Sequence, residues 1–308
     1  MLRSALLWAS RSGVLRDRLM RQRFVQRAVR RFMPGEEAAD ALAACEELRG
    51  AGIGAVLTEL GENVARASDV QRVVSDYDEL LGEIERRGLD AEISVKPTHL
   101  GLDLDPELAH QALVRLAARS AGLGRVLWVD MEGSVYTEPT LALYRRLHAS
   151  QPATGLCLQS YLYRTREDLE SLCEGTPRIR LVKGAYAEPA TIAWARKPEV
   201  DASFFRLAQR LLEAAAGRPG ARAAIATHDR AMIARVIAHA EASGIARERY
   251  EFQMLYGIQP GEQVRLARAG HRVRVLISYG AAWFPWYMRR LAERPANLWF
   301  VARSLLPR

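Results

Sequence analysis

The pattern of apolar and polar positions divides most of the chain into short β-type runs and longer helical segments. The short runs are rich in residues that favour β-strands, and successive runs start roughly 20 to 45 residues apart. There are eight of them, at residues 52–60, 91–98, 125–132, 154–162, 178–186, 222–229, 250–257 and 271–278. The segments between them carry apolar residues at helical spacing. Apolar strands that alternate with helices are typical of a parallel sheet buried on both faces.

Eight βα units in a row predict an α/β fold, the (β/α)8 TIM barrel, with extra helices in front of it. The alternative is a doubly wound open sheet, which would be expected to carry a glycine-rich phosphate-binding turn after its first strand. Residues 50–55 (GAGIGA) match such a turn, but they follow a helical segment and precede a strand, the reverse of the required order. We interpret them as a helix end followed by a strand start, which favours the barrel.

The basic residues are unevenly distributed along the 308-residue chain. Residues 1–34 hold nine Arg and one acid, Asp17, and this excess equals the net charge of +8 of the whole chain. Apolar residues recur there at helical spacing until Pro34 and Gly35 break the pattern. We therefore predict a basic N-terminal helical arm at 1–34 and a neutral catalytic barrel at 35–308. The arm resembles a mitochondrial presequence superficially; it could also dock on an anionic membrane, or be a solvated or oligomer-forming helix pair.

Composition excludes several classes of protein. With 49% hydrophobic and 26% charged residues the chain is globular, and no apolar run approaches the ~20 residues that span a bilayer. Cys45, Cys157 and Cys173 are too few and too far apart for a disulfide framework, and we interpret them as small buried side chains. The six His show no metal-ligand spacing, so we expect no metal. The neutral charge of residues 35–308 argues against nucleic-acid binding.

Polar residues lie where the predicted strands end, which is where barrels carry their catalytic groups. They are Lys96, Asp130, Gln159, Arg180, Lys183, Thr227, His228 and Gln253. The chain has three Lys, and two of them are in this set, whereas Lys197 is expected on a solvated loop. Asp130 ends an apolar run and needs a partner, for which Lys96 on the adjacent strand is the obvious candidate. The two Lys could bind a carboxylate or a cofactor, form a Schiff base, or serve in ion pairs.

A second group of candidates follows the eighth run. Arg289 and Arg290 lie beside an aromatic cluster, and two guanidinium groups suit a carboxylate, which takes bidentate hydrogen bonds. Glu293 comes four and three residues later, so it can orient one of them on a helix. The alternative is a solvated basic patch on the last helix.

Seven motifs of the chain resemble, in order, those of the proline dehydrogenase family, and in particular its short monofunctional bacterial members. They are VKPTHLGLD (95–103), VDME (129–132), LQSYLY (158–163), RLVKGAY (180–186), ATHD (226–229), FQ (252–253) and RRLAE (289–293). The resemblance covers nearly the whole chain. It implies a distorted barrel with bound FAD that oxidises L-proline to Δ1-pyrroline-5-carboxylate by hydride transfer from C5 to flavin N5. The electrons would then pass to a membrane quinone.

The resemblance also implies roles for single residues. Arg289 and Arg290 would hold the substrate carboxylate with help from Lys96, Glu293 would orient the pair, and Asp130 would support Lys96. Tyr186 would line the pocket. Arg180 would approach flavin N5 and Gln159 the pyrimidine edge. Other parts of FAD would contact Met131, Lys183, Gly184, Ala185, Thr227, His228 and Gln253.

Two positions depart from the family pattern. Leu276 and Trp286 stand where the family usually has Tyr, and both belong to the wall around the substrate ring. Losing the hydroxyl at 276 removes a donor and opens space, so a 4-hydroxyproline or another substituted proline is an alternative substrate. A Schiff-base lyase that uses Lys183 or Lys96 is an alternative from another class. We expect a bacterial cytoplasmic enzyme that docks on the inner face of the membrane through residues 1–34.

Overall fold

A computed structural model describes residues 31–284 of the chain. Within this range eight parallel strands close into a barrel in sequence order, and β8 pairs with β1. The strands are β1 (Gly54–Glu59), β2 (Ala91–Val95), β3 (Leu127–Val129), β4 (Thr154–Gln159), β5 (Arg178–Val182), β6 (Arg222–Ala226), β7 (Tyr250–Leu255) and β8 (Val273–Tyr279). Each overlaps one run predicted from the sequence. The (β/α)8 barrel is therefore confirmed, and the open doubly wound sheet is wrong.

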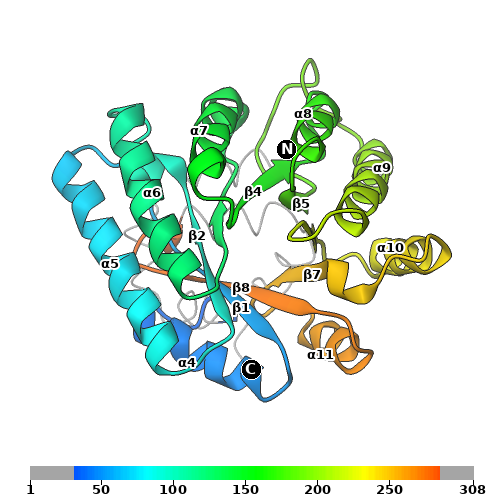
Figure 1. Cartoon of the computed structure of the whole chain (residues 1–308), viewed down its shortest axis with the longest axis horizontal. Coiled ribbons are helices and arrows are strands. Elements are labelled where there is room, and N and C mark those ends of the chain that lie inside the picture. The colour runs from blue at the N-terminus through cyan, green and yellow to red at the C-terminus, as the bar shows by residue number, and fades with distance from the viewer. Residues whose placement is uncertain (1–30, 285–308) are drawn as a thin grey trace, which may run out of the picture.

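Helices surround the barrel, as Figure 1 shows. They are α4 (Ala38–Arg49), α5 (Ala67–Arg86), α6 (Pro106–Gly122), α7 (Thr137–Ser150), α8 (Thr165–Cys173), α9 (Lys197–Ala216), α10 (Arg230–Ala242) and α11 (Pro260–Arg268), with short 3-10 turns η1 (Pro97–Leu100), η2 (Ser134–Tyr136) and η3 (Arg247–Arg249). Two of these helices have side-chain N-caps. The carboxylates of Asp105 and Asp229 accept hydrogen bonds from backbone N–H groups of the first turns of α6 and α10.

The glycine string at 50–55 has the role expected from its order in the chain. Helix α4 ends at Arg49, Gly50 follows as its cap, and β1 begins at Gly54. Gly52 has a φ of +71°, a conformation that favours glycine and turns the chain from the helix into the strand. The segment connects a helix to a strand and is no phosphate-binding turn.

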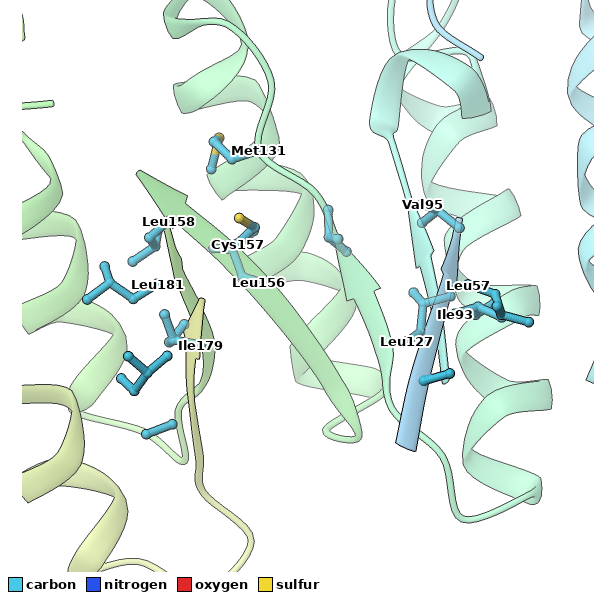
Figure 2. Packing of buried hydrophobic residues seen from close by; sticks show 14 of the residues in the cluster. Leu57, Ile93, Val95, Leu127, Met131, Leu156, Cys157, Leu158, Ile179 and Leu181 are labelled. Atoms are coloured by element: carbon cyan, nitrogen blue, oxygen red, sulfur yellow. The ribbon is translucent and has the colours of Figure 1, made fainter. Parts of the chain in front are cut away.

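Two apolar layers result from the alternation of side chains along the strands. Leu57, Ile93, Leu127 and Leu156 are fully buried in the large core between the strands and the helices (Figure 2). Inside the barrel a smaller cluster contains Val56, Val126, Trp128 and Ala224, with Leu276 packed against it.

The three Cys are free and buried, as expected. Burial raises the pKa of the Cys157 thiol to about 12, so this thiol is not a nucleophile.

Some predictions fall on residues that the structure does not describe. Residues 1–30 of the basic arm, and Trp286, Arg289, Arg290 and Glu293, lie outside the described range. The division into an arm at 1–34 and a barrel at 35–308 therefore stays a prediction. Between residues 31 and 284, no helix is both long and apolar enough to cross a membrane.

Candidate active site

The candidate residues gather at the carboxyl ends of the strands, as the barrel topology requires. Lys96 directly follows β2, Asp130 follows β3, Gln159 ends β4, and Arg180 lies on β5. Lys183 comes directly after β5, Thr227 and His228 follow β6, and Gln253 lies on β7. One end of the barrel thus presents cations, amides and a carboxylate together.

Asp130 is the centre of this group. Its Oδ1 accepts hydrogen bonds from Ser94 Oγ at 2.7 Å and from Arg180 Nη1 at 2.8 Å, and its Oδ2 lies 3.5 Å from Lys96 Nζ. Arg180 Nη1 also donates to Ser94 Oγ at 3.0 Å. The expected pairing of Asp130 with Lys96 is present, but Arg180 is the nearer partner. The carboxylate charge of Asp130 is therefore compensated by two cations.

Arg180 is buried, with its side chain 4% exposed, although only part of its hydrogen-bonding capacity is used. Its Nε and Nη2 are buried and have no hydrogen-bond partner among residues 31–284. The guanidinium carbon lies 4.7 Å from the centre of the Trp128 ring. Two donors of a fixed cation can therefore serve a bound polar group at the mouth of the barrel.

The two Gln side chains offer acceptors that complement these donors. Gln159 Nε2 donates to the backbone oxygens of Met131 and Glu132, each at 3.1 Å, and Gln253 Nε2 donates to Glu251 at 2.6 Å. The Oε1 atoms of both Gln are buried without a partner in the described part of the chain. A ligand that both accepts and donates hydrogen bonds at its edge fits this set.

Lys183 binds carboxylates on two other elements. Its Nζ lies 2.5 Å from Asp201 of α9 and 3.2 Å from Asp229, which caps α10. Lys197 binds the same two carboxylates. Our expectation of a loop position for Lys197 is wrong, because Lys197 begins α9 and Asp201 lies one turn later, although its side chain is 74% exposed.

The residues next to Lys183 form a close-packed turn. Gly184 has a φ of +114°, and a Cβ there would lie 2.3 Å from the Tyr161 ring, so only glycine fits. Ala185 and Tyr186 follow Gly184 in the chain. A Cβ added to Gly133 would lie 3.9 Å from the Tyr186 ring, so Tyr186 borders the loop after β3. Met131 in the same loop is buried.

Thr227 and His228 order the loop after β6. Thr227 Oγ1 accepts from the backbone N–H of Asp229 at 3.2 Å. His228 Nε2 accepts from the N–H of Leu255 at 2.8 Å, which leaves the proton of the neutral ring on Nδ1. These contacts hold both side chains beside the ends of β6 and β7.

Leu276 lies at the middle of β8, with its side chain on the inner face of the barrel. It is partly exposed and packs against the inner cluster of Val56, Trp128 and Ala224. From inside the barrel, Leu276 therefore packs against the cluster that contains Trp128, whose ring lies against Arg180.

Sequence reasoning missed three residues that support the site. Ser94 and Trp128 come two positions before Lys96 and Asp130 on the same strand faces, so the two-residue period could have found them. Glu132 accepts hydrogen bonds from the Thr98 N–H at 3.1 Å and from Thr98 Oγ1 at 2.6 Å, and connects the turn after Lys96 to the loop after β3. Burial raises the pKa of Glu132.

A closed (β/α)8 barrel with a cation-rich cluster at the carboxyl ends of its strands defines a barrel enzyme with a site for an anionic ligand or a cofactor. The sequence profile of the proline dehydrogenase family matches residues 41–303. Proline dehydrogenase 1 of Bacillus subtilis (strain 168) is 35% identical over 306 residues, 99% of each chain. Proline dehydrogenase of Deinococcus radiodurans is 36% identical over 295 residues, 94% of this chain and 93% of its own. The chain belongs to the proline dehydrogenase family.

Solved structures of larger proteins share the fold. Proline utilization A (PutA) from Bdellovibrio bacteriovorus, in a form inactivated by N-propargylglycine, superposes with a TM-score of 0.78 at 24% identity. This match covers 87% of the present chain and 32% of that one, so the chain corresponds to about a third of PutA. PutA from Corynebacterium freiburgense gives a TM-score of 0.71 at 21% identity, over 98% of this chain and 34% of that one.

Proposed function

We propose that this enzyme oxidises L-proline to Δ1-pyrroline-5-carboxylate with FAD as its cofactor and a quinone as the final electron acceptor. The observation that carries the proposal is the Arg180 guanidinium, which is buried, fixed by Asp130 and left with two buried donors that no described residue uses. Membership of the proline dehydrogenase family supports the same reaction.

The polar atoms at the mouth of the barrel fit the edge of a flavin. Arg180 offers donors, and the Oε1 atoms of Gln159 and Gln253 offer acceptors to a heterocycle that carries both carbonyl oxygens and an N–H. When bound, FAD supplies the acceptor for the hydride. The fixed charge of Arg180 would stabilise the negative charge that develops during the reaction. By the family resemblance, other parts of the cofactor would be held by Met131, Lys183, Gly184, Ala185, Thr227 and His228.

The substrate would be held at its carboxylate. We assign this role to Arg289, Arg290 and Lys96, with Glu293 orienting the Arg pair and Tyr186 bordering the ring. Clamping the carboxylate aims the C5–H bond, which is the contribution of positioning to catalysis.

Proline must react as the free amine, because its nitrogen lone pair assists the loss of hydride from C5, and the nitrogen then gives up its proton. The carboxylate of Asp130 is covered by Arg180 and Lys96. It therefore does not favour the protonated amine of the substrate.

Leu276 keeps a substituted proline as a second candidate substrate. Its apolar side chain lies on the inner face of the barrel, where a Tyr hydroxyl would otherwise be expected. Turnover of L-proline and of 4-hydroxyproline should be compared by kcat/KM. A preference for L-proline of about tenfold or more, worth about 1.4 kcal/mol in transition-state binding, eliminates the substituted substrate.

A Schiff-base lyase is not supported by the surroundings of the two Lys. Lys183 lies between the carboxylates of Asp201 and Asp229, and Lys96 faces Asp130, whereas a Schiff-base lysine needs a desolvated pocket or a neighbouring cation. A lyase would join a lysine to the carbonyl carbon of its substrate, so treatment with borohydride in the presence of a small keto acid such as pyruvate should leave no covalent adduct on Lys96 or Lys183.

The basic arm at 1–34 is proposed to hold the bacterial enzyme at the inner face of the membrane, where a quinone is available. Its excess of Arg suits anionic headgroups. Deleting residues 1–30, which leaves the buried Phe32 and Met33 in place, should abolish binding to anionic liposomes and reduce turnover with a membrane quinone, but not with a water-soluble one. If liposome binding is unchanged, the arm has another role.

The reaction and its cofactor can be tested on the purified full-length chain. Heat or acid should release FAD, identified by its mass, and proline should be converted to a cyclic imine when a quinone analogue is added. Release of FMN or of no flavin contradicts the cofactor assignment. Reduction of NAD⁺ in place of the quinone contradicts the proposed acceptor.

A further inference from the structure

Trp128 lies inside the barrel directly beside the Arg180 guanidinium. Its side chain is fully buried, and guanidinium carbons lie over its ring from two residues, Arg180 at 4.7 Å and Arg222 at 5.5 Å. The indole Nε1 donates to Glu92 Oε2 at 2.8 Å. A buried ring that stacks with two cations and is fixed by a hydrogen bond has one defined orientation.

Below the ring lies a floor of charged residues, which we define as Glu92, Arg222, Glu251 and Arg274. Arg222 donates to Glu92 at 2.6 Å and also to Glu251, and Arg274 Nε lies 3.3 Å from Glu251. Burial opposes the charge of Glu92, but Arg222 and Arg274 outweigh it and lower its pKa. The charged form of Glu92 is therefore favoured, and the floor places the carboxyl groups of Glu92 and Glu251 inside the barrel.

Trp128 separates Arg180 from this floor. The partners of Arg180, Ser94 and Asp130, come later along β2 and β3 than Glu92 and Trp128 do. Arg180 therefore approaches the ring from the carboxyl end of the barrel, opposite to the floor. Its spare donors, Nε and Nη2, would find strong acceptors in the floor carboxylates if the indole were absent.

The neighbouring strand is shaped to receive the indole. Gly155 of β4 pairs with Trp128 in the sheet register, and a Cβ there would lie 2.5 Å from the indole Cε3. Any side chain at 155 would therefore push the ring out of its place. This close approach explains the glycine at the second position of β4.

We propose that Trp128 is a positioning residue for Arg180: it keeps the guanidinium directed at Asp130 and at the flavin and away from the charged floor. This inference rests on the proposed function, because it assigns Arg180 to the cofactor. A turned Arg180 would no longer stabilise the reduced flavin, so the flavin would become harder to reduce.

The test compares Trp128→Leu, Trp128→Phe and Gly155→Ala in the full-length holoenzyme. The Leu variant should favour the oxidised flavin by about tenfold, about 30 mV for a two-electron couple, and should lower kcat more than it raises KM. Gly155→Ala should shift the potential in the same direction, whereas Trp128→Phe keeps a ring and should stay within about threefold. The control Tyr144→Leu removes a buried aromatic residue on α7 and should leave the potential unchanged.

A combination with Arg180→Met tests the path of the effect. Trp128→Leu should add nothing to the potential shift of Arg180→Met, because both remove the same charge from the flavin. An independent shift in the double variant, or an unchanged potential in both Trp128→Leu and Gly155→Ala, overturns the proposal. If Trp128→Leu does not fold, Gly155→Ala and Trp128→Phe decide.

A second readout needs no flavin. The coupling free energy between Asp130 and Arg180, from a double-mutant cycle in urea, should fall by more than half in the Trp128→Leu or Gly155→Ala background. If the wild-type chain binds no flavin, the proposed function fails while this cycle still tests Trp128. An unchanged coupling refutes the positioning role.

Discussion

Replacing Asp130 by Ala should be the most costly single change in the site. The substitution leaves the Arg180 guanidinium, 4% exposed, without its carboxylate and facing Lys96, which is 11% exposed. Removing one partner of a buried ion pair costs about 3 to 5 kcal/mol, and because Asp130 is itself 17% exposed we expect about 3 kcal/mol. Ser94→Ala removes a neutral hydroxyl, which donates to the same carboxylate and accepts from Arg180, and should cost about 1 kcal/mol.

The assay is urea unfolding of the full-length protein at pH 7, with the slope against urea checked to be the same for each variant. Asp130→Asn keeps an acceptor but not the charge and should fall between the other two variants. Combined with Arg180→Met, Asp130→Ala should cost about 2 kcal/mol less than the sum of the single changes, because the double variant no longer contains the buried Arg180 cation that Asp130→Ala alone leaves without its carboxylate. The reasoning is refuted if Asp130→Ala costs no more than Ser94→Ala, or if the Asp130 and Arg180 changes are additive.

Two further predictions concern stability. Burial, followed by the charge of Asp76, raises the pKa of Glu59 to about 7. The folded state therefore keeps a proton on Glu59 at pH values where the unfolded chain has lost it. The free energy of unfolding consequently falls as the pH rises from about 4.5 to 7. Glu59→Gln should therefore add about 2 kcal/mol in urea unfolding at pH 8 and nothing at pH 4, and an equal gain at both pH values contradicts this cause. Gly184→Ala should lower the free energy of unfolding by about 1 to 3 kcal/mol, because the φ of +114° favours glycine and a Cβ would overlap with Tyr161. The control is Gly82→Ala, which should not lower it, because a Cβ at Gly82 meets nothing within 4 Å. Equal effects of the two substitutions would show that position 184 does not need glycine.

The sequence sufficed to predict the order of strands and helices and most of the polar residues at the strand ends. The two-residue period marks which strand residues share a face, and the βα alternation makes neighbours of consecutive strands. The pairing of Lys96 with Asp130 follows from this rule, because β2 and β3 are adjacent.

Contacts across the inside of the barrel could not be predicted in the same way. Arg222 and Glu92 are 130 residues apart, on strands that are not neighbours, and they meet only because the sheet closes. The stack of Arg180 on Trp128 also joins strands that are not adjacent. Which guanidinium takes which carboxylate depends on the stagger of the closed barrel, and periodicity does not contain that information.

The central claim is that proline itself delivers electrons to a flavin held beside Arg180. Anaerobic titration of the purified full-length protein with L-proline, followed by visible absorption, tests it most directly. We predict a yellow protein whose flavin absorption is bleached by proline and restored by a quinone analogue, with much weaker bleaching in Arg180→Met at equal flavin content. A protein without flavin absorption, or a bound flavin that proline does not reduce, would contradict the account.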